Sequence, residues 1–344
     1  MARRLPIAVL VLLLAGAGAR ATPFTPNDRY YGPYEWYGTQ MNLPDAWGFS
    51  LGSSQTIVAV LDTGVMADTP DLAGRLLPPL SATGSPPLDG RAYRHGTWVA
   101  STVGMTVNND LGGAGVGNFS ILPITVTNTL GHNTPQWIAT GIRMAADAGA
   151  RVINVSHSTL SYDPLNDAAG YARTKGALVF VAAGNSDQLN GMTGFDNLIF
   201  VSATNRNDER WHEVLKDGTI VGSSYGPYVD LSAPGDEILI ADPTLLPSGY
   251  GTIHGTSFAS PLAGGAAAMA WSIAPNLTAD QVLGLLYDTA VDLGPAGRDD
   301  EFGRGRIDIG AVAAGAYALA PEPATLALLA GGLAALVIGH RRRG

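Results

Sequence analysis

Residues 55–64 read Gln-Thr-Ile-Val-Ala-Val-Leu-Asp-Thr-Gly. The first seven residues form an apolar run rich in β-branched side chains, which is typical of a strand buried in a parallel sheet. The run ends at Asp62, where a loop begins. Ligand and reaction sites of open α/β sheets lie at the carboxyl ends of the strands. The stretch therefore predicts a buried parallel strand that presents Asp62 at a functional edge.

Runs of the same kind alternate with segments of helical period along the chain. Further strands are expected at residues 121–127, 151–155, 177–182 and 199–203. Helices are expected at residues 96–104, 135–148, 167–175, 257–273 and 279–288. Such alternation predicts an α/β fold with a doubly wound, mostly parallel sheet and helices on both faces. Residues 40–315 contain no internal repeat or long linker, so we expect a single domain.

The composition excludes several classes of protein. Of 344 residues, 14% are charged, which is well below the level of disordered or coiled-coil chains. The net charge is −9 with only two lysines, Lys175 and Lys216, so nucleic acid is not an expected partner. The chain has no cysteine, which excludes disulfides, thiolate catalysis and cysteine-ligated metals.

The first 21 residues have the pattern of a secretory signal. Two arginines precede an apolar run at residues 5–14, and Ala19-Arg20-Ala21 has the small-x-small form that signal peptidase cleaves. The alternative is a buried helix. We expect residues 22–318 to form the folded domain, including an N-terminal arm.

Residues 319–344 form the expected C-terminal tail. Pro321-Glu322-Pro323 precedes an apolar stretch at 324–339, and three arginines follow at 341–343. This order is similar to the PEP-CTERM sorting signal of Gram-negative bacteria, which implies export and processing by an exosortase-type enzyme at the cell envelope or outside the cell. The apolar stretch is short for a membrane span, and a simple tail anchor is the alternative.

Three side chains, far apart in sequence, match the needs of covalent acyl hydrolysis without cysteine: a hydroxyl nucleophile, a base and an orienting carboxylate. Asp62 ends a strand, His95 begins a helix, and Ser257 precedes a glycine-rich helix. Asn185 follows another strand and could donate a hydrogen bond to an oxyanion. Each residue taken singly could be a cap or turn residue.

A rival serine motif also occurs. Residues 222–226 fit G-x-S-x-G, the nucleophile pattern of α/β-hydrolases. Pro227 follows at once and no helix is expected there, so the context does not fit. The chain order Asp62, His95, Ser257 is also opposite to that of α/β-hydrolases.

Four blocks, at residues 62–64, 95–100, 182–185 and 255–261, together resemble the subtilisin-like serine protease family, closest to its thermitase branch. The resemblance extends from about residue 25 to 314. It implies a serine endopeptidase that acts on protein or peptide substrates. The alternative is a noncatalytic surface or matrix protein that keeps the same scaffold.

The resemblance also implies a role for each candidate. Ser257 is the expected nucleophile, His95 the general base and then acid, Asp62 the orienting carboxylate and Asn185 the oxyanion donor. The residues expected to bind substrate are Leu130, Gly131, His132, Ser156, His157, Ser158, Ala183 and Gly184. The second edge usually reads Ser-Leu-Gly in the family, so His157 and Ser158 depart from the pattern. His132 and His157 could favour acidic substrates or be exposed spectators.

Finally, the resemblance implies structural calcium and no organic cofactor. The carboxylates of Asp28 and Asp71 and the amide of Asn109 match the ligands of a thermitase-like site. Main-chain carbonyls would come from Thr106, Leu111 and Gly113. Calcium takes such all-oxygen sets, although an ordinary polar loop is the alternative. We expect a monomer.

Overall fold

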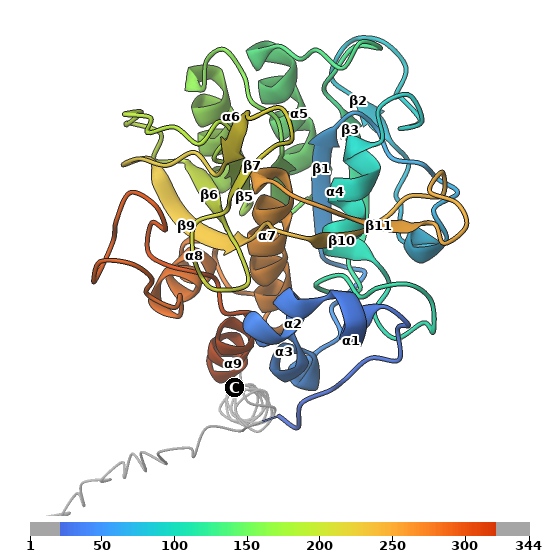
Figure 1. The fold of residues 1–344 in the computed structure, drawn as a ribbon, viewed down its shortest axis with the longest axis vertical. Helices are drawn as coiled ribbons and strands as arrows, with labels where there is room; N and C mark the ends of the chain where they lie inside the picture. Colours follow the sequence, from blue (N-terminus) through green and yellow to red (C-terminus); the bar gives the residue numbers. More distant parts are fainter. Residues whose placement is uncertain (1–20, 321–344) are drawn as a thin grey trace, which may run out of the picture.

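The computed structural model describes residues 21–320, and its centre is a seven-stranded sheet (Figure 1). The strand order is β2-β3-β1-β4-β5-β6-β9, and neighbouring strands run parallel. The strands are β1 (Ile57–Asp62), β2 (Leu80–Ser81), β3 (Ser120–Thr125), β4 (Val152–Val155), β5 (Leu178–Ala182), β6 (Leu198–Thr204) and β9 (Val229–Pro234). Because β3 and β4 flank β1 on opposite sides, the chain winds towards one edge and then the other. The predicted doubly wound α/β fold is confirmed.

Helices cover both faces of the sheet. The helices α4 (His95–Gly104) and α7 (Thr256–Ile273) share one buried core with residues of β1, β4, β5 and β6. The helices α5 (Pro135–Asp147) and α6 (Asp163–Thr174) share a second core on the other face. The helix expected at 167–175 begins earlier, at Asp163, because Pro164 is compatible with a first helical turn.

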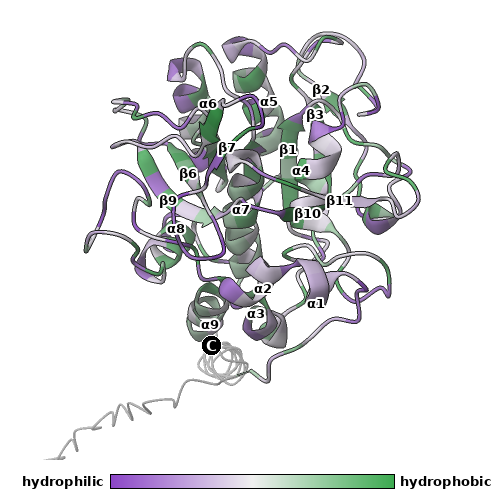
Figure 2. Cartoon of the chain, in the orientation of Figure 1, coloured by the Kyte–Doolittle hydropathy of each residue, from purple (hydrophilic) through white to green (hydrophobic). Residues whose placement is uncertain are grey.

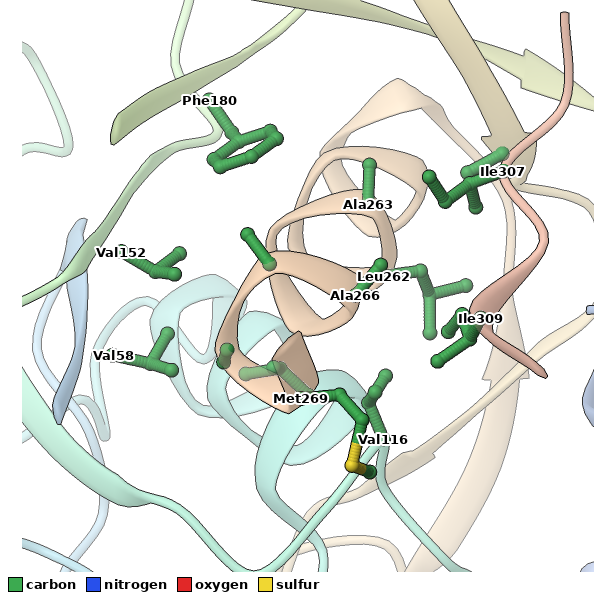
Figure 3. Packing of buried hydrophobic residues seen from close by; sticks show 14 of the residues in the cluster. Val58, Val116, Val152, Phe180, Leu262, Ala263, Ala266, Met269, Ile307 and Ile309 are labelled. Carbon is green, nitrogen blue, oxygen red and sulfur yellow. The ribbon is translucent and has the colours of Figure 1, made fainter. Parts of the chain in front are cut away.

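Helix α7 is the buried axis of the molecule. Sixteen of its 18 residues are buried, and most are alanine, glycine or serine, which lets it approach the sheet closely. Figure 3 shows Val58, Val152 and Phe180 of the sheet on one side of α7 and Ile307 and Ile309 on another. Figure 2 shows hydrophobic colour on the sheet strands, while the surface loops are largely hydrophilic. The packing fixes the start of α7, where Ser257 lies.

The remaining elements surround this centre, and one of them is the helix expected at residues 279–288. The helices are α1 (Tyr31–Tyr34), α2 (Trp36–Gln40), α3 (Leu43–Phe49), η1 (Pro70–Leu72), α8 (Ala279–Asp288) and α9 (Ile309–Leu319). Two hairpins pair β7 (His212–Val214) with β8 (Ile220–Gly222) and β10 (Ile238–Ala241) with β11 (Tyr250–Ile253). Helix α3 packs against α9, so the two ends of the described chain meet on one side (Figure 1).

The expected secretory signal, apart from Ala21, and the Pro-Glu-Pro tail at residues 321–344 lie outside the described residues. Within residues 21–320, no helix combines the length and the hydropathy that a bilayer crossing requires. Helix α9 ends at Leu319.

Candidate active site

The buried Asp62 and the partly exposed His95 form a pair at the carboxyl edge of the sheet. Asp62 is the last residue of β1, and His95 is the first residue of α4. The Nδ1 atom of His95 lies 2.9 Å from each carboxylate oxygen of Asp62. With its proton on Nδ1, the imidazole keeps a free lone pair on Nε2, which is the tautomer a general base needs.

The protein holds Asp62 ionised in spite of its burial. Burial alone would raise the pKa of the Asp62 carboxyl, but His95 and His157 outweigh burial and hold the pKa well below its usual range. The Thr63 N–H also donates to Oδ1 over 2.8 Å. A side chain at Gly96 would place Cβ 2.3 Å from the Gly64 carbonyl oxygen, so a glycine after His95 is needed to bring α4 this close.

Ser257 lies in the first turn of α7. Its Oγ donates to the Ser156 carbonyl oxygen over 3.3 Å, and the Ser156 Oγ donates in return to the Ser257 carbonyl oxygen over 2.8 Å. The ring of His95 lies beside Phe258, with centroids 6.0 Å apart. The Ser257 hydroxyl thus makes its hydrogen bond to Ser156, and no hydrogen bond to His95 is present among the described residues. Attack requires Oγ to turn towards His95 Nε2, and catalytic hydrogen bonds are often loose before substrate binds.

A buried polar network ties the start of α7 to the end of β4. Asn154 donates from Nδ2 to the Ser156 Oγ over 2.9 Å, and the Ser260 Oγ donates to the Asn154 Oδ1 over 2.7 Å. All three side chains are buried. Satisfied networks of this kind rigidify a core, so the position of Ser257 is set from both elements.

Asn185 follows β5 and faces the same start of α7. Its Oδ1 accepts from the Thr256 N–H over 2.9 Å and from the Thr256 Oγ1 over 2.7 Å. These bonds leave the Nδ2 hydrogens free to donate to an oxyanion. Gly255 adopts φ +136°, and a Cβ there would lie 3.1 Å from the Asn185 Nδ2, so glycine keeps this space open.

A cavity of about 670 Å³ opens beside Asn185. It is lined by three of the expected substrate residues, Ser158, Ala183 and Gly184. It is also lined by residues for which the sequence carried no motif, among them Tyr162, Leu189, Met192 and Phe195. The lining mixes aromatic and aliphatic side chains with serine hydroxyls, and a substrate side chain could enter from the Asn185 side.

The expected substrate edges lie next to each other. Leu130, Gly131 and His132 form a turn closed by the paired residues Thr127 and Asn133. The Asn133 Nδ2 donates to the Ser158 carbonyl oxygen over 3.0 Å, which joins this turn to the second edge. Leu130 is exposed, as an open peptide-binding edge requires.

The structure overturns one of the two sequence interpretations of His157. Its side chain is 15% exposed, so it is not an exposed spectator, and its Nε2 lies 3.2 Å from the Asp62 Oδ1. Its ring centroid is 5.3 Å from that of His95. Burial would lower the pKa of His157, but the Asp62 carboxylate outweighs burial and raises it. The imidazole faces Asp62.

The expected calcium ligands are gathered between the N-terminal arm and the loop after α4. The Asp28 carboxylate accepts from the N–H groups of Asn108 (2.7 Å) and Asn109 (3.1 Å). Asp71 accepts from the Asn109 Nδ2 over 2.8 Å and from the Gly113 N–H over 3.2 Å. The Leu111 carbonyl oxygen accepts from the Arg29 N–H, and the Thr106 N–H and Oγ1 donate to the Asp71 carbonyl oxygen.

Glu35, which the sequence did not single out, belongs to the same region. It is buried, and its Oε2 has no hydrogen-bond partner, while its Oε1 accepts from the Ala114 N–H. Burial raises the pKa values of Glu35, Asp28 and Asp71. Repulsion between carboxylates adds to the rise in pKa, from Asp28 and Asp71 at Glu35, from Asp28 at Asp71 and from Asp110 at Asp28. An all-oxygen donor set with excess negative charge and an orphaned carboxylate oxygen fits Ca²⁺, provided that the Asn109 amide turns its oxygen towards the ion.

Comparison with known proteins places this geometry in a family. The sequence profile of the subtilase family (peptidase S8) matches residues 53–305. Thermitase of Thermoactinomyces vulgaris is 32% identical over 289 residues, which cover 83% of this chain and 98% of thermitase. A thermophilic serine proteinase of Bacillus sp. (strain AK1) is 36% identical over 257 residues, which cover 72% of this chain and 59% of that protein.

Solved structures of proteases resemble this chain as well. A protease from Pseudoalteromonas arctica PAMC 21717 superposes with a TM-score of 0.70 at 28% identity, covering 85% of this chain and 99% of that one. A lanthipeptide protease, at 22% identity and a TM-score of 0.69, shares the fold. The chain belongs to the subtilase family, and its class is that of a subtilisin-like serine endopeptidase.

Proposed function

We propose that this protein hydrolyses peptide bonds through an acyl-enzyme, with Ser257 as nucleophile, His95 as general base and then acid, and Asp62 as the orienting carboxylate. The observation that carries the proposal is the Asp62–His95 pair, in which Nδ1 lies 2.9 Å from both carboxylate oxygens. This contact fixes the imidazole tautomer and would stabilise the imidazolium that forms when His95 takes the Ser257 proton.

The steps follow from the side chains around Ser257. His95 removes the hydroxyl proton as Oγ attacks the substrate carbonyl carbon, and the oxyanion is stabilised by the Asn185 Nδ2 and the N–H at the start of α7. His95 then gives the proton to the leaving amine. Water, deprotonated by the same imidazole, releases the acyl group and restores the Ser257 hydroxyl.

Substrate binding would use the joined edges at residues 130–132 and 156–158. An extended peptide lying between them would pair with the main chain of both, as in other strand-addition complexes. Its side chain next to the cleaved bond would enter the cavity lined by Ala183, Gly184 and Phe195. The apolar part of this lining favours apolar side chains.

The decisive test compares the parent protein with Ser257→Ala in hydrolysis of casein and of fluorogenic peptides. Ser85→Ala is the matched control, because Ser85 is an exposed serine outside the site. We expect Ser257→Ala to lose hydrolysis and labelling by a serine-directed phosphonate, while Ser85→Ala keeps both. Equal hydrolysis by Ser257→Ala would refute the assignment, and no hydrolysis by the parent would favour a noncatalytic surface protein.

We also propose that the protein is exported as a monomer and sorted at the envelope. Signal peptidase would remove residues 1–21, and residues 319–344 would direct an exosortase-type enzyme. Support comes from the two sequence patterns and from relatives described as an extracellular serine protease and a cell wall-associated protease. N-terminal sequencing and intact mass of the protein recovered from medium and envelope test both cleavages, and gel filtration tests the monomer.

We propose that the protein binds a structural Ca²⁺ ion and uses no organic cofactor. Asp28, Asp71 and Asn109 would hold the ion together with the carbonyls of Thr106, Leu111 and Gly113. Bound calcium would tie the N-terminal arm to the loop after α4 and would neutralise carboxylates that repel one another in the fold.

A further inference from the structure

Two histidines converge on one carboxylate oxygen in the candidate active site. The Asp62 Oδ1 lies 2.9 Å from the His95 Nδ1 and 3.2 Å from the His157 Nε2. The catalysis proposed above uses the first contact and gives the second no role. The His157 Nε2 is buried and lies close to Asp62, but the geometry of this contact is too poor for a hydrogen bond, so the nitrogen has no hydrogen-bond partner among the described residues.

We propose that Asp62, His95 and His157 form a binding site for a divalent transition-metal ion of the Zn²⁺ type, and that an ion bound there switches the peptidase off. Their three donor atoms lie within 4.8 Å of one another. Among the residues that the structure describes, this is the one group of three histidine or carboxylate side chains so close together. The inhibitory part of the proposal rests on the proposed peptidase function, but the binding part does not.

The distances suit a tetrahedral ion. Zinc bonds of about 2.0–2.2 Å at tetrahedral angles hold neighbouring donor atoms about 3.3–3.5 Å apart. The two separations from the Asp62 Oδ1, 2.9 Å and 3.2 Å, fall about 0.4 Å and about 0.1 Å short of the lower end of that range, and the two imidazole nitrogens lie within 4.8 Å of each other. Small side-chain rotations would therefore create the site without moving β1 or α4.

The donor set selects the kind of ion. Two imidazoles and one carboxylate make the set that zinc takes in open sites with three protein ligands, where water fills the fourth position. Calcium and magnesium prefer oxygen ligands, so this site would discriminate against the ion proposed for Asp28 and Asp71. The chain would thus carry two cation sites of different chemistry.

Inhibition follows because metal binding changes which ring nitrogen of His95 carries the proton. An ion that takes the lone pair of Nδ1 requires the Nδ1 proton to leave, and the neutral ring then carries its one proton on Nε2. Nε2 becomes a donor and can no longer accept the Ser257 proton. Asp62, bound to the ion, also stops orienting the ring. Coordination of the ion breaks no covalent bond of the enzyme or the substrate. Removal of the ion therefore restores activity.

His157 is the ligand by which this chain departs from the family pattern. The family pattern usually has leucine at this position, and a leucine side chain offers no ligand atom. His157→Leu therefore removes one ligand while restoring the residue usual in the family. His157→Asn is a second variant, which replaces the imidazole with another polar side chain. His212→Leu is the matched control, because His212 is an exposed imidazole outside the cluster.

The experiment has two independent readouts. The binding experiment uses the full-length chain with Ser257→Ala, which cannot digest itself. Binding of Co²⁺ is followed by the visible absorption of a tetrahedral complex. Binding of Zn²⁺ is measured by calorimetry. We expect one equivalent of each ion, binding about 100-fold or more weaker in both His157 variants, and unchanged binding in His212→Leu. Binding of equal strength in the His157 variants, or no binding, would overturn the site.

The second readout is hydrolysis by chains with Ser257 intact, in buffers of fixed free Zn²⁺. We expect reversible inhibition of the parent, lifted by a chelator of zinc, and an inhibition constant raised by about 100-fold or more in His157→Leu relative to its own zinc-free activity. Inhibition that is equal in both chains would refute the switch. If the parent hydrolyses nothing, the proposed function fails, while the Co²⁺ titration still decides the site.

Discussion

The side chain of Asp230 should make the free energy of unfolding depend on pH, because its surroundings change the pKa of its carboxyl. It lies in β9, where its Oδ2 accepts from the Phe200 N–H over 3.0 Å, and its side chain is 21% exposed. Burial raises the pKa of this carboxyl to about 6, against 3.8 for an ordinary aspartate, and the nearby Arg298 and Arg304 offset only part of that rise. The folded protein therefore prefers Asp230 in its protonated form.

The sign of the effect follows from this raised pKa. The stability gained from protonated Asp230 is fully present below about pH 4, the range of the unfolded chain, and is lost as pH rises through about 6. A difference of about 2 units, at about 1.4 kcal/mol each, corresponds to about 3 kcal/mol lost between pH 4 and pH 7.5. Asp230→Asn keeps the acceptor for the Phe200 N–H and cannot ionise.

The assay is urea unfolding at pH 4.5, 6.0 and 7.5 in the Ser257→Ala background, which avoids self-digestion. We expect Asp230→Asn to be more stable than its parent by up to about 3 kcal/mol at pH 7.5, but by only about 1 kcal/mol at pH 4.5. Asp167→Asn, at an exposed position of α6, should follow the parent at every pH. An Asp230→Asn protein that keeps the parent's pH slope would refute the reasoning.

The remaining predictions concern the site and the calcium region. Asp62→Asn should lower kcat/KM by about 10⁴, because an amide facing the His95 Nδ1 favours the wrong tautomer; a loss below tenfold in steady-state kinetics would contradict this. Asn185→Ala should lower kcat by about 10²–10³ with little change in KM, and an effect on KM alone would mean that its Nδ2 does not serve the transition state. EGTA at low salt should lower the melting temperature in calorimetry, and Asp71→Asn should abolish that shift; an EGTA-insensitive parent would exclude the calcium site.

The parts of the site carried by local patterns could be predicted from the sequence. The apolar run before Asp62 predicts β1, and the glycine-rich segment after Ser257 predicts α7, because strand and helix periodicity are local properties. Parallel strands then bring their carboxyl ends to one edge, so the positions of Asp62 and Asn185 follow from topology.

Other features depend on contacts between distant segments. The approach of His157 to Asp62 depends on how the loop after β4 packs against β1, and the isolated sequence of that loop indicates only a departure from the family pattern. Glu35 lies in no motif, and its role appears only when the N-terminal arm folds against Ala114. The direction of the Ser257 hydroxyl depends on the χ1 rotamer of the side chain, which no sequence pattern specifies.

Ser257 as the nucleophile, activated by the Asp62–His95 pair, can be tested by covalent labelling. The parent protein is treated with a fluorophosphonate, digested and mapped by mass spectrometry, with Asp62→Asn treated in parallel. We expect a single adduct on Ser257 that forms far more slowly in Asp62→Asn. An adduct on Ser224, or one on Ser257 that forms at the same rate in both proteins, would contradict it.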